Sequence, residues 1–328
     1  GAQVTLGDVQ TDAGAGVADI FDRAFMGDLR KFRRQKRVQR RRIHDDIHAF
    51  PLPVPALRFR VNGGEIKMAE LILREDHGHV ARLVLNSAQN FNALSLEMIA
   101  ALETAFDQIG KEPTIRAVIV AANGKVFSAG HDLRQMQASR ADADQGRAAF
   151  DRLFARCAQM MQMIPALPQP VIAEVQGIAT AAGCQMVASC DLAVAAEGVK
   201  FGVNGVNLGL FCSTPMVALS RAVPPKAAFE MLVTGEFINA ERAKEIGLIN
   251  RVVPAGKLQE ETMALAQTIA AKLPAAVRLG KRAIQDQQNL GLAQAYDVAG
   301  AAMCENMMLP ETDEGISAFL EKRPPNWS

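Results

Sequence analysis

Paired cysteines, aromatic residues and long apolar runs are all scarce in this sequence. Its five cysteines include no C-x-x-C pair, which argues against a disulfide framework and a zinc cluster and fits a reducing compartment. With one Trp and one Tyr, the core must be built from aliphatic side chains, Met and Phe. No apolar run approaches the roughly 20 residues that span a bilayer, so we expect a soluble protein without a membrane partner.

The overall composition is that of a folded chain. Of 328 residues, 49% are hydrophobic and 22% are charged, which is typical of a globular protein with a sizeable core. The abundance of Ala and Met favours helix over strand. Disorder is therefore not expected over most of the chain.

Charge is segregated at the N-terminus. Nine of the thirteen residues from Arg30 to Arg42 are Arg or Lys, and residues 1–67 carry thirteen basic and eight acidic side chains. Such a run suggests a tail that binds nucleic acid or a membrane surface, an Arg-rich targeting segment, or a solvated extension. We favour the extension, because no apolar period organises the run, and we do not expect a nucleic-acid partner.

Folding signals begin at Met68. Residues Gly63–Lys67 are what a purine-rich ribosome-binding site would encode if it were translated, so we hypothesise that Met68 is the native start. We therefore divide the chain into an extension (1–67), a core (68–254) and a helical C-terminal region (255–328).

Strand and helix patterns alternate after Met68. Residues 70–75 and 79–85 predict a hairpin, and residues 116–121 predict a buried strand. Between them, Ser95 is a suitable N-cap for a helix over Leu96–Ile109. Further strands and helices are expected downstream, at Pro170–Val175, Ala181–Ser189, Asp191–Ala195, Val206–Leu210 (an apolar run) and Pro215–Ala222.

The chain after Val253 has a purely helical pattern. We expect its methionines at 303, 307 and 308 to lie in a core or a subunit contact. Four helices are predicted here, over Lys257–Lys272, Pro274–Gln288, Leu290–Met308 and Thr312–Glu321.

Two strand-to-helix junctions share one layout. In Val118–Asp132 and in Val171–Cys184, an apolar strand enters a loop of small residues that opens a helix. The first N–H groups of a helix lack intrahelical partners, so two converging junctions could stabilise negative charge on a carbonyl oxygen. The alternative is that small residues merely allow close packing of the backbone.

Both junctions resemble the signatures of a known family. Phe127–Leu133 (FSAGHDL) resembles the first signature of the crotonase (enoyl-CoA hydratase/isomerase) superfamily, F-x-A-G-x-D-[LI], and Pro170–Cys184 resembles the second, K-P-V-I-A-x-V-x-G-x-A-x-G-G-G-x. The resemblance runs from about Met68 to the C-terminus. Further stretches in register are Asn92-Ala93-Leu94, Cys190-Asp191-Leu192, Phe201-Gly202, Leu232–Gly235, Ala243–Val253 and Ser317–Arg323.

The resemblance implies an α/β fold, a spiral of β-β-α repeats followed by a helical trimerisation region. It also implies a homotrimer or dimer of trimers that binds an acyl-CoA thioester. No cofactor is expected beyond the coenzyme A of the substrate, and no metal. We expect a cytoplasmic location, or the mitochondrial matrix if the Arg-rich segment is a targeting segment.

The resemblance also assigns roles to particular residues. The main-chain N–H groups of His131 and Ala182 fall on the donors of the family's oxyanion hole. Coenzyme A contacts fall on the protein's own Gln89, Asn90, Asn92, Ala129 and Arg134, and on Phe319 and Lys322, which would reach the coenzyme A of a neighbouring subunit.

Two positions depart from the hydratase pattern. Gln185 and Gly205 stand where the family has its two glutamates. An amide cannot act as a general acid or base, and a glycine has no side chain at all. Ser213 lies near the position where the dienoyl-type isomerases of the family have an aspartate. The His131 imidazole either acts as an acid or base or only lines the wall of the site. The resemblance thus favours an enzyme of the hydratase/isomerase (lyase or isomerase) type that stabilises an enolate or oxyanion without ordinary hydration. The alternatives are a decarboxylase, a thioesterase, or a catalytically silent CoA-binding module.

Other polar residues near these motifs have simple structural interpretations. We expect Asp132 to cap a helix, Glu174 to be structural in its strand, and Asn207 to tie a loop. Cys184 and Cys212 are expected to be small buried fillers.

Overall fold

The computed structural model describes residues 60–61, 64–65 and 71–327, which belong to one compact unit. Strands β1 (Arg60–Val61) and β2 (Gly64–Glu65) form a short antiparallel pair inside the segment that we expected to be an extension. The basic run and the proposed start at Met68 lie outside the described residues.

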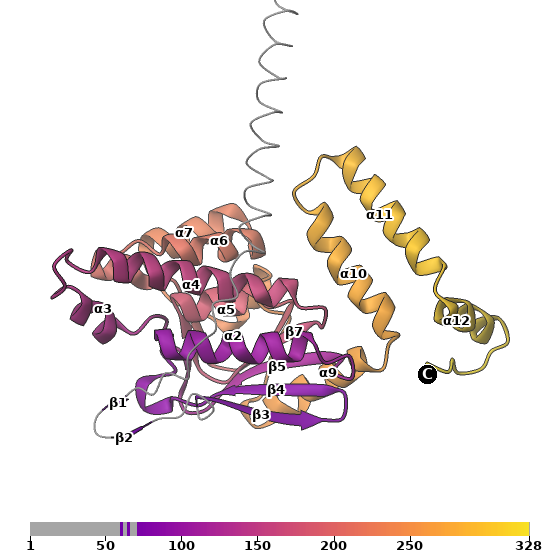
Figure 1. The fold of residues 1–328 in the computed structure, drawn as a ribbon, viewed down its shortest axis with the longest axis horizontal. Coiled ribbons are helices and arrows are strands. Elements are labelled where there is room, and N and C mark those ends of the chain that lie inside the picture. Colours follow the sequence, from indigo (N-terminus) through magenta and orange to yellow (C-terminus); the bar gives the residue numbers. More distant parts are fainter. Residues whose placement is uncertain (1–59, 62–63, 66–70, 328) are drawn as a thin grey trace, which may run out of the picture. The chain divides into compact units, whose positions relative to one another are not determined.

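A six-stranded sheet forms the centre of the fold (Figure 1), in the order β12-β9-β7-β5-β4-β3. Strands β3 and β4 form the predicted hairpin, and the other neighbours run parallel. All six residues of β5 are buried, as expected for a parallel strand covered on both faces. The strands are β3 (Ile72–His77), β4 (Val80–Leu85), β5 (Ala117–Ala122), β7 (Val171–Val175), β9 (Leu192–Ala196) and β12 (Arg251–Val253).

A second sheet has the order β11-β10-β8-β6. Strand β6 follows β5, β8 follows β7 and β10 follows β9, so each repeat places one strand in each sheet before its helix. This is the spiral of β-β-α units that the sequence predicts. The strands are β6 (Val126–Ser128), β8 (Ile178–Thr180), β10 (Lys200–Gly202) and β11 (Ile238–Asn239).

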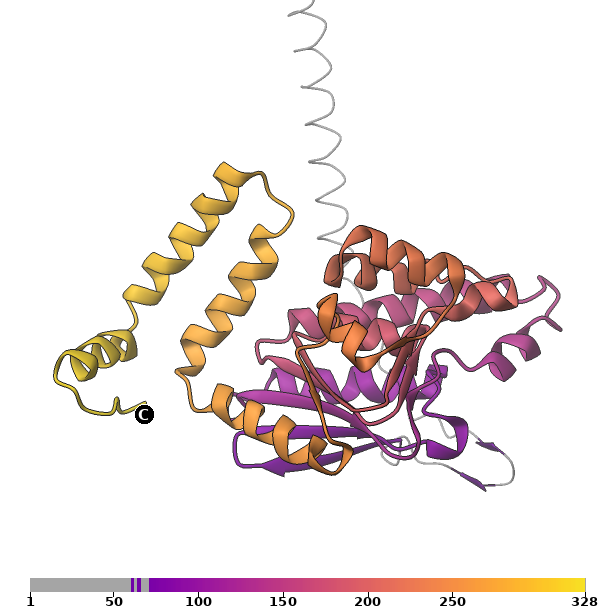
Figure 2. The ribbon, with the colours of Figure 1, turned by 180° about the vertical axis from the view of Figure 1, so that it is seen from behind.

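Helices cover both sheets (Figure 2). As predicted, Ser95 caps the first long helix, and its Oγ accepts a hydrogen bond from the Met98 N–H at 3.2 Å. The predicted apolar run at Val206–Leu210 is mainly a 3-10 helix. The helices up to residue 257 are η2 (Ala88–Asn90), α2 (Leu96–Gly110), α3 (Leu133–Ser139), α4 (Arg147–Ala166), α5 (Ala182–Ser189), η3 (Asn204–Leu208), α6 (Ser213–Ala222), α7 (Pro225–Thr234), α8 (Ala240–Glu245) and η4 (Ala255–Lys257).

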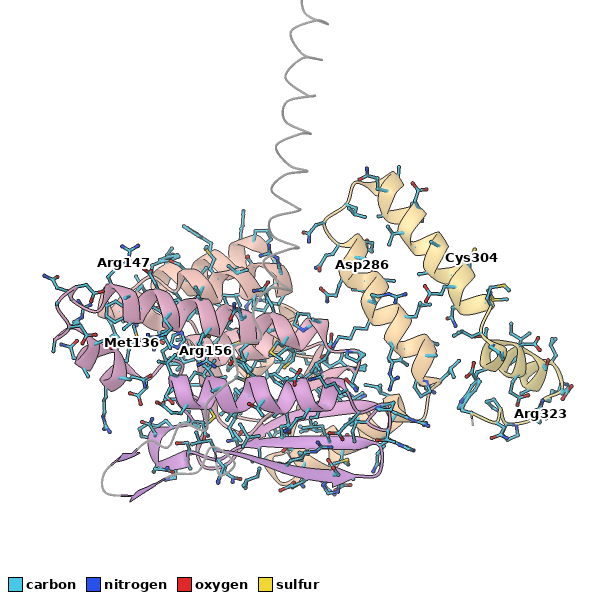
Figure 3. The ribbon with its side chains drawn as sticks, viewed as in Figure 1. Met136, Arg147, Arg156, Asp286, Cys304 and Arg323 are labelled. Carbon is cyan, nitrogen blue, oxygen red and sulfur yellow. The ribbon has the colours of Figure 1, made fainter. Side chains whose placement is uncertain are left out.

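Helix α4, the longest among the described residues, is absent from the sequence-based prediction. It packs on α2, and Arg156 is labelled in Figure 3. Arg156 forms an ion pair with Glu103 of α2 at this contact. Its buried side chains follow helical spacing, so the periodicity was available in the sequence. They are Leu153, Cys157, Met160, Met161 and Ile164.

The four predicted C-terminal helices are present, but the first belongs to the core. Helix α9 (Leu258–Ala270) contacts β4, β5, β7 and β9, and its apolar side chains join the core cluster. The helical region is therefore better placed after α9 than after residue 254. It comprises α10 (Pro274–Gln287), α11 (Leu292–Met307) and α12 (Pro310–Leu320). None of the described helices is long and apolar enough to cross a membrane.

Helix α10 is fastened to the core through a buried lysine. Lys281 Nζ donates to the carbonyl oxygens of Ile164 (3.0 Å) and Gln169 (2.9 Å) and to Asp191 Oδ2 (2.7 Å). The same carboxylate oxygen accepts from the Val171 N–H at 2.7 Å. Burial raises the pKa of Asp191 and lowers that of Lys281, and their mutual attraction opposes both shifts. The ion pair therefore links α10 to the start of β7.

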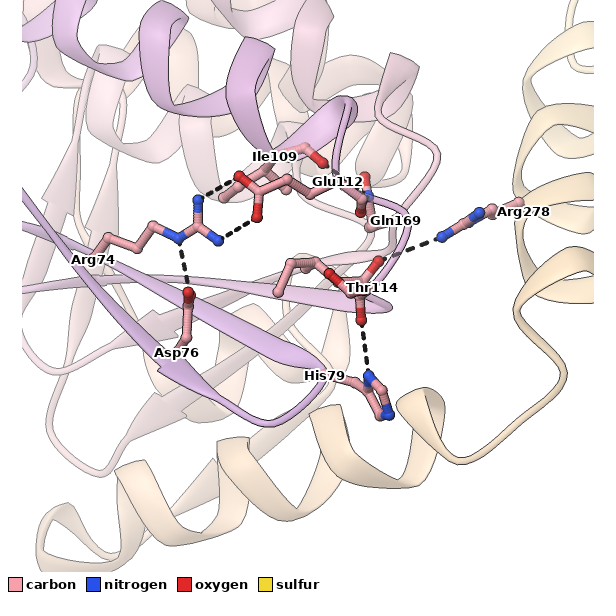
Figure 4. Close-up of polar contacts among 9 residues, drawn as sticks. Arg74, Asp76, His79, Ile109, Glu112, Thr114, Gln169 and Arg278 are labelled. Atoms are coloured by element: carbon pink, nitrogen blue, oxygen red, sulfur yellow. Dashed lines mark hydrogen bonds and ion pairs between the residues drawn. The ribbon is translucent and has the colours of Figure 1, made fainter. Parts of the chain in front are cut away.

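A second set of contacts holds α10 to the loop before β5 (Figure 4). Arg278 donates to the Pro113 carbonyl oxygen at 2.8 Å, and the adjacent Glu112 pairs with Arg74 of β3 at 2.6 Å. One loop is thus held by a strand on one side and by a C-terminal helix on the other.

We predict that Lys281→Ala lowers the free energy of unfolding by about 3–5 kcal/mol, because it leaves Asp191 buried without its cation. The matched control is Arg282→Ala, which removes an exposed pair with Glu305 and should cost under about 1 kcal/mol. Urea denaturation measures both. Equal losses in the two variants would contradict this account of how α10 is attached.

Candidate functional site

The two predicted junctions meet at one edge of the second sheet. Strands β6 and β8 are parallel neighbours, so their carboxyl ends lie together and lead into α3 and α5. A Cβ placed on Gly130 would lie 3.1 Å from the Ala182 nitrogen and 2.8 Å from the Ala181 Cβ. A Cβ on Gly183 would lie 2.3 Å from the Ser128 carbonyl oxygen. The two main chains therefore touch where the sequence led us to expect a convergence.

Two main-chain donors are free at this contact. Among the described residues, the N–H groups of His131 and Ala182 have no hydrogen-bond acceptor. Ala182 is the first residue of α5, where helical N–H groups lack partners, and its side chain is fully buried. The junctions thus bring two unsatisfied donors together.

Ala181, which precedes the second donor, has an unusual backbone conformation. Its φ and ψ are 50° and −120°, a combination that glycine adopts far more readily than a residue with a Cβ. Its N–H donates to the Gly202 carbonyl oxygen at 2.9 Å, and its carbonyl oxygen accepts from the Gln185 N–H at 3.0 Å. The second bond holds the peptide that carries the Ala182 N–H, and the first holds the peptide before it.

The His131 side chain is held at one of its two nitrogens. Its Nδ1 lies 3.2 Å from the Leu94 carbonyl oxygen, and its ring makes an edge contact with Phe154 of α4, at 5.6 Å between centroids. Burial lowers the pKa of His131, and the bond to Leu94 opposes that shift. Its Nε2 is buried and has no partner among the described residues. Sequence reasoning missed Leu94 and Phe154, because only the tertiary fold brings them to His131.

Gln185 lies one turn into α5 and is 4% exposed. Its Oε1 is buried and has no hydrogen-bond partner among the described residues. The residue also lines a cavity of about 640 Å³ bounded by α4, α5, α6 and α10, with Met161, Val217 and Ile284 in its wall. A neutral amide thus stands where the sequence comparison expects a carboxylate.

Gly205 has no room for a side chain. A Cβ there would lie 2.3 Å from the Leu210 carbonyl oxygen and 2.9 Å from Cys212 Sγ.

Cys184 and Cys212 are buried, as predicted. Burial raises the pKa of both thiols, and it raises that of Cys184 to about 12. Ser213 opens α6 in an exposed position, with its Oγ donating to the Phe211 carbonyl oxygen at 3.3 Å.

The residues expected near coenzyme A differ in how freely they can meet a ligand. Gln89 and Arg134 are exposed, whereas Asn90 Nδ2 donates to Asp132 Oδ2 at 2.8 Å. Ala129 donates its N–H to the Phe91 carbonyl oxygen at 3.0 Å.

Asn92 is fully buried, and its amide is used inside the protein. Its Oδ1 accepts from the Ser87 N–H at 2.9 Å, and its Nδ2 donates to the carbonyl oxygens of Asn123 (2.9 Å) and Val126 (2.8 Å). Asn92 therefore ties its own loop to the turn between β5 and β6 rather than presenting its side chain to a ligand.

Phe319 and Lys322 lie at the end of the C-terminal helices, away from the junctions in sequence. Phe319, in α12, is 82% exposed, and Lys322 follows the helix with φ 57°. Their predicted contact with a neighbouring subunit's ligand stays a prediction.

Three structural interpretations are confirmed. Asp132 caps α3 by accepting from the N–H groups of Arg134 (2.9 Å) and Gln135 (3.2 Å). Glu174 is buried in β7 and pairs with Arg82 at 2.6 Å, and Asn207 Nδ2 donates to the Gly235 carbonyl oxygen at 3.1 Å.

The spiral of β-β-α units, with two free donors at adjacent strand-to-helix junctions, defines the class of fold, and comparison with known proteins identifies the family. Residues 75–328 match the family model Enoyl-CoA hydratase/isomerase, so the chain belongs to that family. It is 42% identical over 272 residues to the mitochondrial enoyl-CoA hydratase domain-containing protein 3 of Danio rerio, with 83% of this chain and 91% of the relative covered.

Solved structures show the same fold. An enoyl-CoA hydratase from Mycobacterium smegmatis is 53% identical, with a TM-score of 0.75, and the match covers 78% of this chain and 98% of that one. Human enoyl-CoA hydratase domain-containing protein 3 is 44% identical with a TM-score of 0.74, covering 78% and 100%. The predicted crotonase-type fold is thereby confirmed.

We predict that Ala181→Gly raises the free energy of unfolding by about 1 kcal/mol, because it relieves the strain of a Cβ at φ 50° by more than glycine's added chain entropy costs. Ala188→Gly is the matched control in the same helix, and it should lower stability by about 1 kcal/mol. Thermal and urea unfolding measure both. If glycine at 181 destabilised as much as glycine at 188, Ala181 would not be strained.

Proposed function

We propose that this chain binds an acyl-CoA thioester and stabilises negative charge on the thioester oxygen, as an enolate or a tetrahedral oxyanion. The observation that carries the proposal is the pair of free N–H groups at His131 and Ala182. Fixed donors aimed at developing charge lower a reaction barrier most effectively where water is excluded. The thioester oxygen is the group that two such donors would fit.

Ordinary hydration is not the reaction that we propose. Adding water to a C=C bond needs a group that activates the water and a group that supplies a proton. The two positions assigned to these groups hold Gln185 and Gly205, and the loop around Gly205 leaves no space for a carboxylate side chain. Decarboxylation of a malonyl-type thioester or slow thioester hydrolysis would use the two donors without a glutamate pair.

Coenzyme A contacts follow from the same proposal. Gln89 and Arg134 are exposed and free to meet the nucleotide and its phosphates, while Asn90 and Asn92 would act by holding their loop. No further cofactor is part of the proposal.

A catalytically silent CoA-binding module is the second candidate, and the missing carboxylates favour it. Turnover of a panel of acyl-CoA thioesters, crotonyl-CoA included, separates the two.

For location, the Danio rerio relative is named as a mitochondrial protein. We therefore propose the mitochondrial matrix in place of the cytoplasm, with the Arg-rich segment as its targeting signal, and this proposal replaces the hypothesis that Met68 is the native start.

We also propose that the chain forms a trimer or a dimer of trimers. Helices α11 and α12 carry more exposed apolar surface than an isolated domain normally leaves in water. The exposed side chains include Leu292, Tyr296, Met303, Met307, Met308, Ile316, Phe319 and Leu320. Light scattering should give three or six times the chain mass, and a persistent monomer at micromolar concentration would refute the proposal.

Removing one donor should weaken the site. Ala182→Pro deletes the N–H at the first position of α5, where proline suits a helix. We expect acyl-CoA affinity to fall about tenfold and any turnover about 10²-fold or more. Ala182→Gly keeps the donor and should change either value less than about twofold. Calorimetry and steady-state kinetics provide the measurements, with circular dichroism to check the fold.

Unchanged affinity and turnover in a folded Ala182→Pro protein would require the donor assignment to be withdrawn. Proline at 182 also restricts the backbone angles of the preceding residue, Ala181. The double variant Ala181→Gly/Ala182→Pro relieves that restriction and still lacks the N–H at 182, so it tests the loss of the donor alone.

A further inference from the structure

The peptide between Gly130 and His131 carries the first of the two free donors. Gly130 has φ 85°, and because it lacks a Cβ it leaves the orientation of this peptide largely unrestricted. A residue with a Cβ would be strained there, since that atom would lie 2.8 Å from the Ala181 Cβ. The direction of the His131 N–H therefore depends on the hydrogen bonds around it.

Leu94 holds this peptide at its carbonyl oxygen. The Leu94 N–H donates to the Gly130 carbonyl oxygen at 2.7 Å, and that oxygen lies in the same planar peptide as the His131 N–H. A hydrogen bond at the oxygen of a peptide also polarises it, which strengthens its N–H as a donor. The peptide of the second donor is held in the same way, by the Gln185 N–H on the Ala181 carbonyl oxygen at 3.0 Å.

Ser128 connects the loop of Leu94 to the segment of the first donor. Its Oγ donates to the Asn92 carbonyl oxygen at 2.9 Å and accepts from the Gly130 N–H at 3.3 Å. Asn92 lies two residues before Leu94, and the Ser128 side chain is fully buried. One hydroxyl group thus holds both the loop that supplies the Leu94 N–H and the peptide that precedes the donor peptide.

The loop has other attachments that do not involve this hydroxyl. The Ala129 N–H donates to the Phe91 carbonyl oxygen at 3.0 Å, and the Asn92 side-chain amide donates to the carbonyl oxygens of Asn123 and Val126. Loss of the hydroxyl should therefore leave the loop attached and change only how tightly the peptide at Gly130 is oriented.

We propose that Ser128 is a positioning residue, whose hydroxyl sets the direction of the His131 N–H and so the strength of its hydrogen bond to a thioester oxygen. The inference rests on the proposed function and adds a residue that touches no ligand. Donors stabilise developing charge most effectively when they are fixed in advance, and small errors of position are costly. The alternative is a purely structural hydroxyl that ties the loop without affecting the donor.

The spectroscopic test uses the full chain with an acyl-CoA that carries ¹³C at the thioester carbonyl. Ser128→Ala removes the hydroxyl, and Ser128→Cys replaces it with a thiol, which is a weaker donor and acceptor. The matched control is Thr262→Val, which removes another fully buried hydroxyl, one that donates to the Leu258 carbonyl oxygen at 2.8 Å in α9. The lowering of the carbonyl stretching frequency should be smaller in Ser128→Cys than in the unaltered protein, smallest in Ser128→Ala, and unchanged in Thr262→Val.

Any turnover should follow the same order. A poorly oriented donor weakens the transition state more than the ground state, so kcat should fall about tenfold in Ser128→Ala while KM stays within about twofold. Thr262→Val should change neither value more than about twofold. Equal effects of Ser128→Ala and Thr262→Val on frequency and kcat would assign Ser128 the purely structural role and overturn the proposal.

A second measurement needs no ligand. The chain has five histidines, so labelling histidine alone with ¹⁵N restricts the amide spectrum to five signals. The signal of His131 is the one that disappears in His131→Gln. We expect it to shift in Ser128→Ala, and less in Ser128→Cys, while the other four signals stay in place. Ser128→Cys alone provides both tests if Ser128→Ala does not fold.

The two measurements separate failure of this inference from failure of the proposed function. A His131 amide signal that does not move in a folded Ser128 variant overturns the inference, whatever the chain binds. A signal that moves, in a protein that does not lower the carbonyl frequency of a bound thioester, contradicts the proposed function and leaves the effect of Ser128 on the His131 N–H in place.

Discussion

The close approach of two main-chain segments, 128–131 and 180–183, is the constraint on which the site depends. Glycine at 130 and 183 permits it, since a Cβ at 183 would lie 2.3 Å from the Ser128 carbonyl oxygen and a Cβ at 130 would lie 2.8 Å from the Ala181 Cβ. Parallel pairing of β6 with β8 places the two segments at the same edge of one sheet. In the proposed function, the free N–H groups of His131 and Ala182 would meet a ligand together only because this contact exists.

The same contact explains why side-chain chemistry can change around the site without loss of its geometry. A main-chain donor does not depend on the identity of its side chain, so histidine and alanine are compatible with the role proposed for 131 and 182. Gly205 shows the opposite case, because the Leu210 carbonyl oxygen and Cys212 Sγ occupy the space that a side chain would need. Restoring a carboxylate at that position would require the loop from η3 to α6 to be rebuilt.

Much of this arrangement could be predicted from the sequence, because it follows local rules. The Ser95 and Asp132 caps, the buried strand β5 and the two junctions were all recognisable from residue type and spacing. Helix α4 was missed although its apolar residues recur at helical intervals, because its N-cap is Gly146, which has no side chain, and the acceptor of the Ala148 N–H is Asp144, two residues before that cap. The place of α9 on the sheet, the conformation of Ala181 and the unpaired Nε2 of His131 depend on distant segments, and no local pattern encodes them.

The central claim is that two main-chain N–H groups bind the thioester oxygen, and vibrational spectroscopy of the bound carbonyl tests it most directly. Two strong hydrogen bonds polarise a C=O bond and lower its stretching frequency. For an acyl-CoA with ¹³C at the thioester carbonyl, we predict a lower frequency when bound than in water, and a smaller decrease in Ala182→Pro. A bound frequency equal to or above that in water would contradict the account.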